Sequence, residues 1–374
     1  MTPSTQPPRP RESVYLHWAR TQPPATHNLA TSGVASWPLE RLPGAWSDLE
    51  LTGPSTYGYA PLVEALAELN RTTPDRIFTT SGTSMANQLA MAAILEPGDE
   101  VLIEAPTYEP LLAVASYLGA TIRRFERRIE EGFEVDADDV LAGMGRNCKL
   151  VVISNLHNPS SNQTSNETLI RIGAAAAERG AKVLVDEVYL DTLFENTPPS
   201  AATLGDAFIV TNSLTKVYGL SGLRCGWVYG EPQIVSKLWR FNDLFDIIPP
   251  FPAQKLSVLA LKALPMIRDH YRALLAENRS LVSDFLRTRK DLEATVNPAG
   301  TVVFPKLLTL TGDVDAFASW LRTEYQIAVV PGRFFEVPER FRIGYGGHTP
   351  ALKESLSRLG QALDDWQRKP TPRA

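Results

Sequence analysis

Short apolar runs alternate with helix-like segments through the middle of the chain. The runs read EVLIEAP (100–106), KLVVISN (149–155), AKVLVDEVYL (181–190), AFIVTNS (207–213) and RCGWVYG (224–230). The segments between them include MANQLAMAAILEPG (85–98) and NETLIRIGAAAAERG (166–180). Apolar strands separated by helices are typical of a mostly parallel sheet covered on both faces, so we predict an α/β fold.

Beyond about residue 250 the pattern changes to long helices around short strands. A helical stretch over 251–292 is interrupted at Pro265, and helices are also predicted over 314–326 and 349–366. The predicted strands there are GTVVFP (300–305), IAVVPG (327–332) and RFRIGYG (340–346). This pattern indicates a second, smaller α+β domain.

The change in pattern divides the chain into two predicted domains. The predicted parts are a large α/β domain at 45–260, a small α+β domain at 1–44 with 261–374, and disordered tails at 1–12 and 368–374.

The composition of the chain limits which binding partners and which cellular location we expect. The 374 residues carry a formal net charge of −5, and no apolar run is long enough to cross a bilayer, so we expect neither a nucleic-acid nor a membrane partner. The polar, proline-rich N-terminus does not resemble a secretory signal. Cys148 and Cys225 form no CxxC pair, so we expect no disulfide framework, no metal site and a cytoplasmic location.

Polar residues follow the apolar runs directly, where ligands bind in an open parallel sheet. They are Ser81, Gly82 and Thr83 after IFTT, Asn155, His157 and Asn158 after KLVVIS, Asp186 and Tyr189 in VDEVY, and Ser213 and Lys216 in SLTK. The Ser-Gly-Thr turn would leave free backbone N–H groups at a helix start, which suits an anion, although Ser and Thr are also common helix caps. We expect His157 to stabilise its own turn.

Lys216 stands among small and apolar neighbours, SLT before it and VYGLSG after it. Most lysines point to water, but desolvation here would lower the pKa of the amine, as a Schiff-base lysine requires. A lone Asp186 would more often be a turn or a cap. Together with the anion site and Asn158, however, these residues match the needs of pyridoxal 5'-phosphate: an amine, an acid for the ring nitrogen, donors for the phenolate oxygen and a phosphate cradle.

The motifs SGTSMA, APTYEP, SNLHNPSSN, VDEVY, SLTKVYGLSGLRCGW, VVPGRFF and RFRIGYG occur in that order between residues 81 and 346, within a likeness that covers roughly residues 28–365. In this order and number the sequence resembles class I/II aminotransferases of the fold-type I pyridoxal phosphate-dependent superfamily. The resemblance implies an enzyme that moves an amino group between an α-amino acid and a 2-oxo acid by a ping-pong mechanism, as a homodimer with active sites at the subunit interface.

The resemblance also implies roles for single residues. Lys216 would form the Schiff base and move the substrate proton, Asp186 would pair with the ring nitrogen, and Tyr108 would stack on the ring. Asn158 and Tyr189 would hydrogen-bond the phenolate oxygen. The implied phosphate ligands are Ser81, Gly82, Thr83, Ser213 and Arg224, with Tyr57 of the dimer partner, or Tyr59 as the alternative.

The substrate carboxylate would bind Arg342, with Arg340 as the less favoured neighbour, and Gly33 would offer a backbone N–H. The turn at 158–161 reads NPSS and lacks the glycine usual in this family. A second cation for an acidic substrate side chain is not evident from the pattern, although Arg20 or Arg41 could serve.

Three other functions fit parts of the sequence. A β-lyase or a biosynthetic cyclase would use the same cofactor residues, because a shared fold does not fix the reaction. A ligand-sensing regulator is disfavoured, since the resemblance begins by residue 28 and leaves no room for a DNA-binding head. A dinucleotide enzyme is disfavoured too, because GLSGLRCG runs into a strand instead of a helix.

Overall fold

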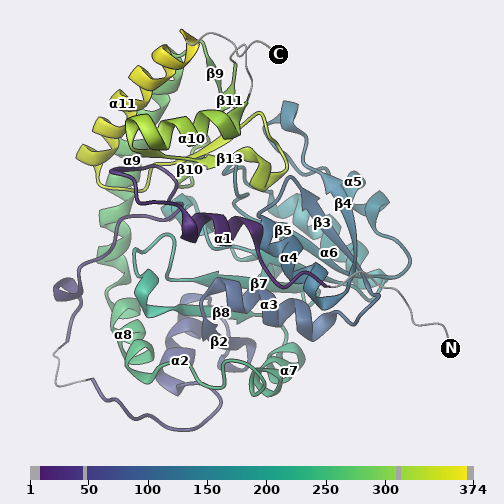
Figure 1. The fold of residues 1–374 in the computed structure, drawn as a ribbon. Helices are drawn as coiled ribbons and strands as arrows, with labels where there is room; N and C mark the ends of the chain where they lie inside the picture. Colours follow the sequence, from purple (N-terminus) through teal and green to yellow (C-terminus); the bar gives the residue numbers. More distant parts are fainter. Residues whose placement is uncertain (1–8, 45–48, 309–312, 369–374) are drawn as a thin grey trace.

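The computed structural model describes residues 9–44, 49–308 and 313–368. Its largest sheet has seven strands in the order β2-β8-β7-β6-β5-β3-β4 (Figure 1). The strands are β2 (Ile77–Ser81), β3 (Glu100–Ala105), β4 (Thr121–Glu126), β5 (Cys148–Ser154), β6 (Lys182–Asp186), β7 (Phe208–Ser213) and β8 (Cys225–Tyr229). β4, β3, β5, β6 and β7 run parallel, and β8 is antiparallel to β7 and β2, which confirms the predicted α/β fold.

Helices cover both faces of this sheet, which is why its strands are apolar on both sides. Successive residues of β5 belong to different cores: Leu150 packs in one with α3 and α4, and Val151 packs in the other with α6. The helices that belong with the sheet are α2 (Ala60–Leu69), α3 (Thr83–Ile94), α4 (Glu109–Leu118), α5 (Ala137–Gly143), α6 (Asn166–Glu178), α7 (Pro232–Asn242) and α8 (Phe251–Lys262).

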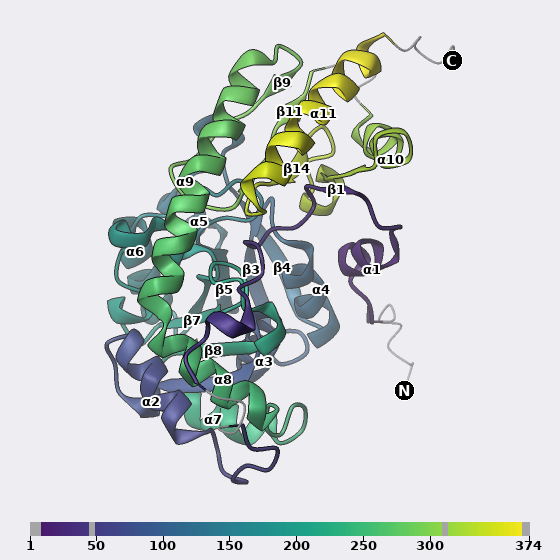
Figure 2. The ribbon, with the colours of Figure 1, turned by 90° about the vertical axis from the view of Figure 1, so that its left-hand side faces the viewer.

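The C-terminal third contains long helices and short strands, as the sequence predicted. The helices are α9 (Leu264–Thr288), α10 (Val314–Tyr325) and α11 (Thr349–Gln367). The helical break falls at Ala263, with Pro265 in the first turn of α9, where its missing N–H costs nothing. Figure 2 shows α9 running from the side of α8 up to α11.

The short strands form three small sheets that include the N-terminal segment. The pairs are β1 (His27–Asn28) with β12 (Ile327–Ala328), β9 (Leu292–Glu293) with β11 (Lys306–Leu307), and β14 (Phe341–Gly344) with both β10 (Val302–Val303) and β13 (Val330–Pro331). Beyond β1 the chain reaches the large sheet, where Val34 N donates to Lys216 O at 2.9 Å. This segment therefore passes directly beside the predicted lysine.

The two-residue strands β1, β9 and β11 were not predicted from the sequence, and in the large sheet β4 was missed. Its sequence TIRRFE is not an apolar run because β4 is the edge of the sheet and is partly exposed. Arg123 and Arg124 form ion pairs there with Glu100 and Glu336.

The domain boundaries at 45 and 260 stay a prediction, and the predicted tails fall mainly on residues 1–8 and 369–374, outside the described part. Within the described part, no helix has the length and apolarity that a membrane crossing requires.

Glu187 is a buried carboxyl group on the turn after β6. Its Oε1 accepts a hydrogen bond from Ala201 N at 2.7 Å, and burial raises the pKa of Glu187 to about 8 from an ordinary 4.5. The folded protein therefore holds this proton more tightly than the unfolded chain does. The contribution of Glu187 to the free energy of unfolding should be fully present below about pH 4.5 and should decrease as the pH rises toward 8.

We expect Glu187→Gln to reduce this pH dependence, because the glutamine carbonyl can still accept from Ala201 N without a charge to desolvate. Each unit of pKa displacement corresponds to about 1.4 kcal/mol of unfolding free energy. Urea unfolding at pH 5 and pH 8 measures the effect. An equal loss of stability between the two pH values in wild type and variant would contradict it.

Candidate active site

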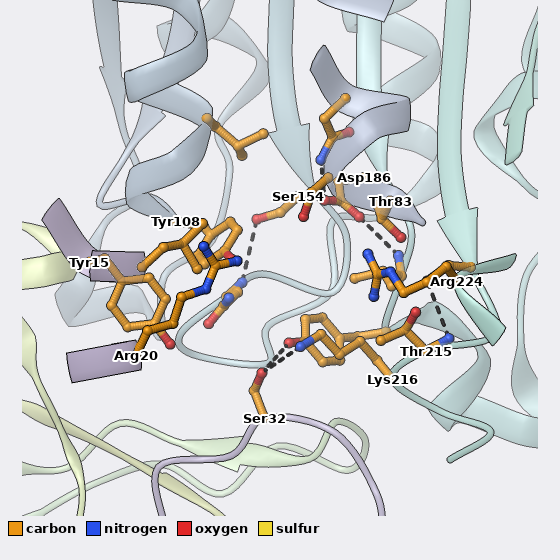
Figure 3. A pocket seen from close by; sticks show the side chains of 18 residues that line it. Tyr15, Arg20, Ser32, Thr83, Tyr108, Ser154, Asp186, Thr215, Lys216 and Arg224 are labelled. Carbon is orange, nitrogen blue, oxygen red and sulfur yellow. Dashed lines mark hydrogen bonds between the residues drawn. The ribbon is translucent and has the colours of Figure 1, made fainter. Parts of the chain in front are cut away.

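A cavity of about 520 Å³ lies at the carboxyl ends of β5, β6 and β7 (Figure 3). The register pairs Ser154 with Asp186, the last residues of β5 and β6, and Asp186 with Thr211, so β7 extends two residues farther to Ser213. The predicted residues that line the cavity are Thr83, Tyr108, Asn158, Asp186, Tyr189, Ser213, Lys216 and Arg224. The lining residues that were not predicted to act on the cofactor include Tyr15, Arg20, Ser32, Asn87 and Thr215.

Lys216 lies three residues beyond β7 and points into the cavity (Figure 3). Its Nζ donates to Ser32 Oγ at 3.2 Å, and Tyr189 OH donates to the same oxygen at 2.8 Å. Burial, followed by the charge of Arg342, lowers the pKa of the Lys216 amine. A lowered pKa increases the fraction of neutral, nucleophilic amine.

Asp186 ends β6 and is buried at the base of the cavity. Its Oδ2 accepts from Asn87 Nδ2 at 2.8 Å, its Oδ1 accepts from Val188 N at 3.1 Å, and Asn87 is itself held by Thr211 Oγ1 at 2.6 Å. Burial raises the pKa of Asp186 to about 6. A cationic partner at this place would lower that pKa again, so the carboxyl suits a protonated ring nitrogen.

The Ser-Gly-Thr turn has the close approach expected of an anion cradle. Gly82 has φ 86°, and a Cβ on it would lie 2.4 Å from an Arg224 terminal nitrogen, so only glycine lets that guanidinium approach. Arg224 also donates to Ser81 O at 3.2 Å. Ser81 N and Oγ both donate to an Asp246 carboxylate oxygen, at 3.2 and 2.5 Å, so a protein carboxylate occupies these two donors.

Arg342 is buried on β14, and two residues that line the cavity, Asn158 and Tyr15, accept hydrogen bonds from it. It donates to Asn158 Oδ1 at 2.9 Å and to Tyr15 OH at 3.1 Å, and its Nε has no hydrogen-bond partner among the described residues. Arg340 instead donates to Phe304 O at 2.9 Å and pairs with Glu293, away from the cavity. This placement favours Arg342 over Arg340 as a carboxylate ligand.

The NPSS turn is held without its glycine by Ser161. This residue adopts φ 62°, and its hydroxyl donates to Val302 O at 2.9 Å. His157 stabilises the same turn, because its ring nitrogens contact Ser160 Oγ and Pro106 O. Burial lowers the pKa of His157, so it stays neutral.

Besides Ser81, Gly82 and Arg342, the predicted residues Gly33, Tyr57 and Tyr59 lie outside the cavity lining. Gly33 is adjacent to Lys216, since a Cβ on Gly33 would lie 3.4 Å from Lys216 O. Tyr57 is 60% exposed, and its hydroxyl donates to Asp243 at 2.9 Å, while the Tyr59 ring packs edge-on against Phe251. Neither tyrosine lines the cavity of its own chain.

Ser32 and Asn87 were missed by the sequence reading for different reasons. Ser32 lies in an irregular segment with no periodic pattern and reaches Lys216 from far along the chain. Asn87 gives a weak signal, since it is a polar residue on the buried side of an otherwise apolar helix.

Comparison with known proteins defines the class of this protein. Residues 48–359 match the family Aminotransferase class I and II, and the chain belongs to that pyridoxal phosphate-dependent enzyme family. It is 29% identical to capreomycidine synthase of Streptomyces vinaceus, over 83% of this chain and 80% of that protein. It is 28% identical to an aspartate aminotransferase of Streptomyces avermitilis, over 78% of this chain and 74% of that protein.

Solved structures agree on the fold. A PLP-dependent aminotransferase from Streptococcus suis superposes with a TM-score of 0.83 at 25% identity, covering 92% of this chain and 95% of that one. The PLP-dependent cyclase OrfR superposes with a TM-score of 0.86 at 21% identity, covering 97% and 100%. Aminotransferase and cyclase structures therefore share this fold.

The residues present fit pyridoxal phosphate. Thr83 Oγ1 and Thr215 Oγ1 are buried, line the cavity and have no hydrogen-bond partner among the described residues. Buried hydroxyls without partners are costly, and cofactor oxygens would satisfy them. Lys216, Asp186 and the Arg224 cradle supply the remaining groups that the cofactor needs.

We expect Arg224→Gln to weaken binding of pyridoxal phosphate about 10- to 100-fold, because a charge-assisted bond to phosphate is lost. Binding of pyridoxal, which lacks the phosphate, should change much less. Fluorescence titration of the cofactor-free protein with both compounds measures the difference, and Arg287→Gln on the exposed side of α9 is the control. Equal weakening for both compounds would refute the assignment of Arg224 to the phosphate.

Proposed function

We propose that the protein is an aminotransferase that transfers the amino group of an α-amino acid to a 2-oxo acid in two half-reactions. The observation that carries this proposal is the position of the partly buried Lys216 amine. It shares one cavity with Asp186, and Arg342 donates a hydrogen bond to Asn158, which lines the same cavity. When bound, pyridoxal phosphate supplies a carbonyl that takes the amino group and a ring that accepts electrons.

Lys216 acts as the general base in this proposal. With its pKa lowered by burial, the neutral Lys216 amine could take the proton from the substrate α-carbon and hold it for transfer within the cavity. Ser32 Oγ lies 3.2 Å from Nζ and orients the amine through its hydrogen bond. Tyr189, bonded to the same hydroxyl, holds Ser32 in place.

Asp186 would pair with the ring nitrogen and favour its protonated form, and Asn87 holds the Asp186 carboxylate in place by a hydrogen bond. Tyr108 lines the cavity where it can stack on one ring face. Arg342 binds the substrate α-carboxylate with its free Nε, with Gly33 as a backbone donor nearby. Asn158 lines the cavity and accepts a hydrogen bond from Arg342, so it would connect the cofactor with the residue that binds the substrate carboxylate.

A homodimer forms part of this proposal. Large apolar side chains are exposed at Tyr57 and at Leu244, Phe245, Ile247 and Ile248, in a segment whose Asp243 accepts from Tyr57 and whose Asp246 accepts from Ser81. Such a cluster is typical of a protein interface, and Tyr57 within it would reach the phosphate of the neighbouring subunit. A cytoplasmic location stays our expectation.

A cyclase or β-lyase is the second candidate, favoured by the similarity to capreomycidine synthase. Two-substrate kinetics with a panel of amino acids and 2-oxo acids separates the reactions. Transamination predicts parallel double-reciprocal lines and one new amino acid for each 2-oxo acid formed. Release of pyruvate and ammonia without a 2-oxo acid acceptor would favour the lyase, and an intramolecular ring product would favour the cyclase.

A further inference from the structure

Arg20 is a cation at the cavity mouth that the proposed reaction leaves unused. It lies in the last turn of α1 (Val14–Thr21), and it lines the cavity together with Leu16. Residues four apart share one face of a helix, so α1 presents both side chains to the cavity. Figure 3 shows Arg20 on the same wall as Tyr15 and Tyr108, with Lys216 and Arg224 opposite.

Helix α1 is fixed at its first turn. Ser13 Oγ caps the helix by accepting from Leu16 N at 3.1 Å, and both Ser13 Oγ and Val14 N donate to Glu109 of α4. Tyr15 accepts from Arg342, the proposed carboxylate ligand. The same short helix therefore contacts Arg342 at one end and carries Arg20 at the other.

The charges around the cavity are unbalanced at Arg20. Among the described residues, Arg20 forms no hydrogen bond or ion pair, and Asp186 is the only carboxylate that lines the cavity. Asp186 is already bonded to Asn87 and Val188. The mouth therefore offers a guanidinium without a protein anion to pair with it.

We propose that Arg20 binds the side-chain carboxylate of the substrate, so that the preferred substrates are dicarboxylic amino acids and the matching 2-oxo acids. This inference rests on the proposed function, in which Arg342 takes the α-carboxylate. The planar fork of a guanidinium matches a carboxylate in two parallel hydrogen bonds. Arg41, the other cation considered from sequence, lies 4.2 Å over the Trp37 ring and does not line the cavity.

Selectivity between isosteric substrates tests the proposal. For the pyridoxal phosphate-loaded enzyme, kcat/KM should be higher for glutamate than for glutamine, and Arg20→Gln should lower that ratio about tenfold or more. Arg20→Lys should retain part of the preference, and Arg41→Gln should leave the ratio as in wild type. A ratio that is the same in wild type and Arg20→Gln would overturn the assignment.

Equilibrium binding gives a second readout that needs no turnover. Calorimetry should show that succinate binds the loaded enzyme more tightly than butyrate, and that Arg20→Gln or added salt removes most of this difference. Equal affinities in wild type would overturn the inference while leaving transamination intact. Absence of any 2-oxo acid product, with the succinate preference retained, would instead refute the proposed function and support the role of Arg20.

Discussion

Replacing Lys216 with alanine is expected to lower the rate of amino-group transfer about 10⁴-fold, the upper range for loss of a general base. The variant should also lose the covalent attachment of pyridoxal phosphate that borohydride makes permanent. The reason is that Lys216 supplies the only lysine amine among the residues that line the described cavity. Single-turnover kinetics and intact-protein mass after reduction measure the two effects.

Lys149→Ala is the matched control, because Lys149 is exposed on β5 and its strand neighbours are buried. This control should keep both the rate and the reducible attachment. A Lys216→Ala protein that is still labelled at one site after reduction would show that another amine carries the cofactor.

Replacing Asp186 with asparagine is expected to lower kcat/KM about 10³-fold, as for loss of a preorganised charge at a reacting centre. Asparagine keeps the size and the contact with Val188 N but cannot hold the ring nitrogen protonated. Affinity for pyridoxal phosphate should fall less, since the Arg224 cradle is unchanged. Steady-state kinetics at saturating cofactor measures the loss.

Glu187→Gln is the control for this substitution, because it removes a buried carboxyl from the adjacent residue that does not line the cavity. It should leave kcat/KM near that of wild type. Comparable losses from both substitutions would indicate that the defect comes from folding, and thermal unfolding of each variant at pH 7 checks this directly.

The sequence predicted the strands at the centre of the sheet and the polar residues that follow them. That prediction succeeded because buried parallel strands are apolar at nearly every position, so their ends are marked by the first polar residue. The edge strand β4 failed this criterion, since half of it faces water. The ping-pong reaction and the residue roles rest on proposals that the variants above test.

Contacts made across the chain could not be predicted in the same way. Ser32 reaches Lys216 from an irregular segment 184 residues away, and Tyr15 reaches Arg342 across 327 residues. Local periodicity contains no information about such pairs. The hydrogen-bond partners that distinguish Arg342 from Arg340 likewise lie far away in the sequence, at Asn158 for Arg342 and at Phe304 for Arg340.

We infer that Lys216 moves a proton within a cavity that holds a bound amino acid and pyridoxal phosphate. A single-turnover experiment tests it most directly: the loaded enzyme is mixed with glutamate, without any 2-oxo acid, and the products are quantified after acid extraction. We expect one 2-oxo acid and one pyridoxamine phosphate per active site. Continued turnover with release of ammonia, and no pyridoxamine phosphate, would contradict it.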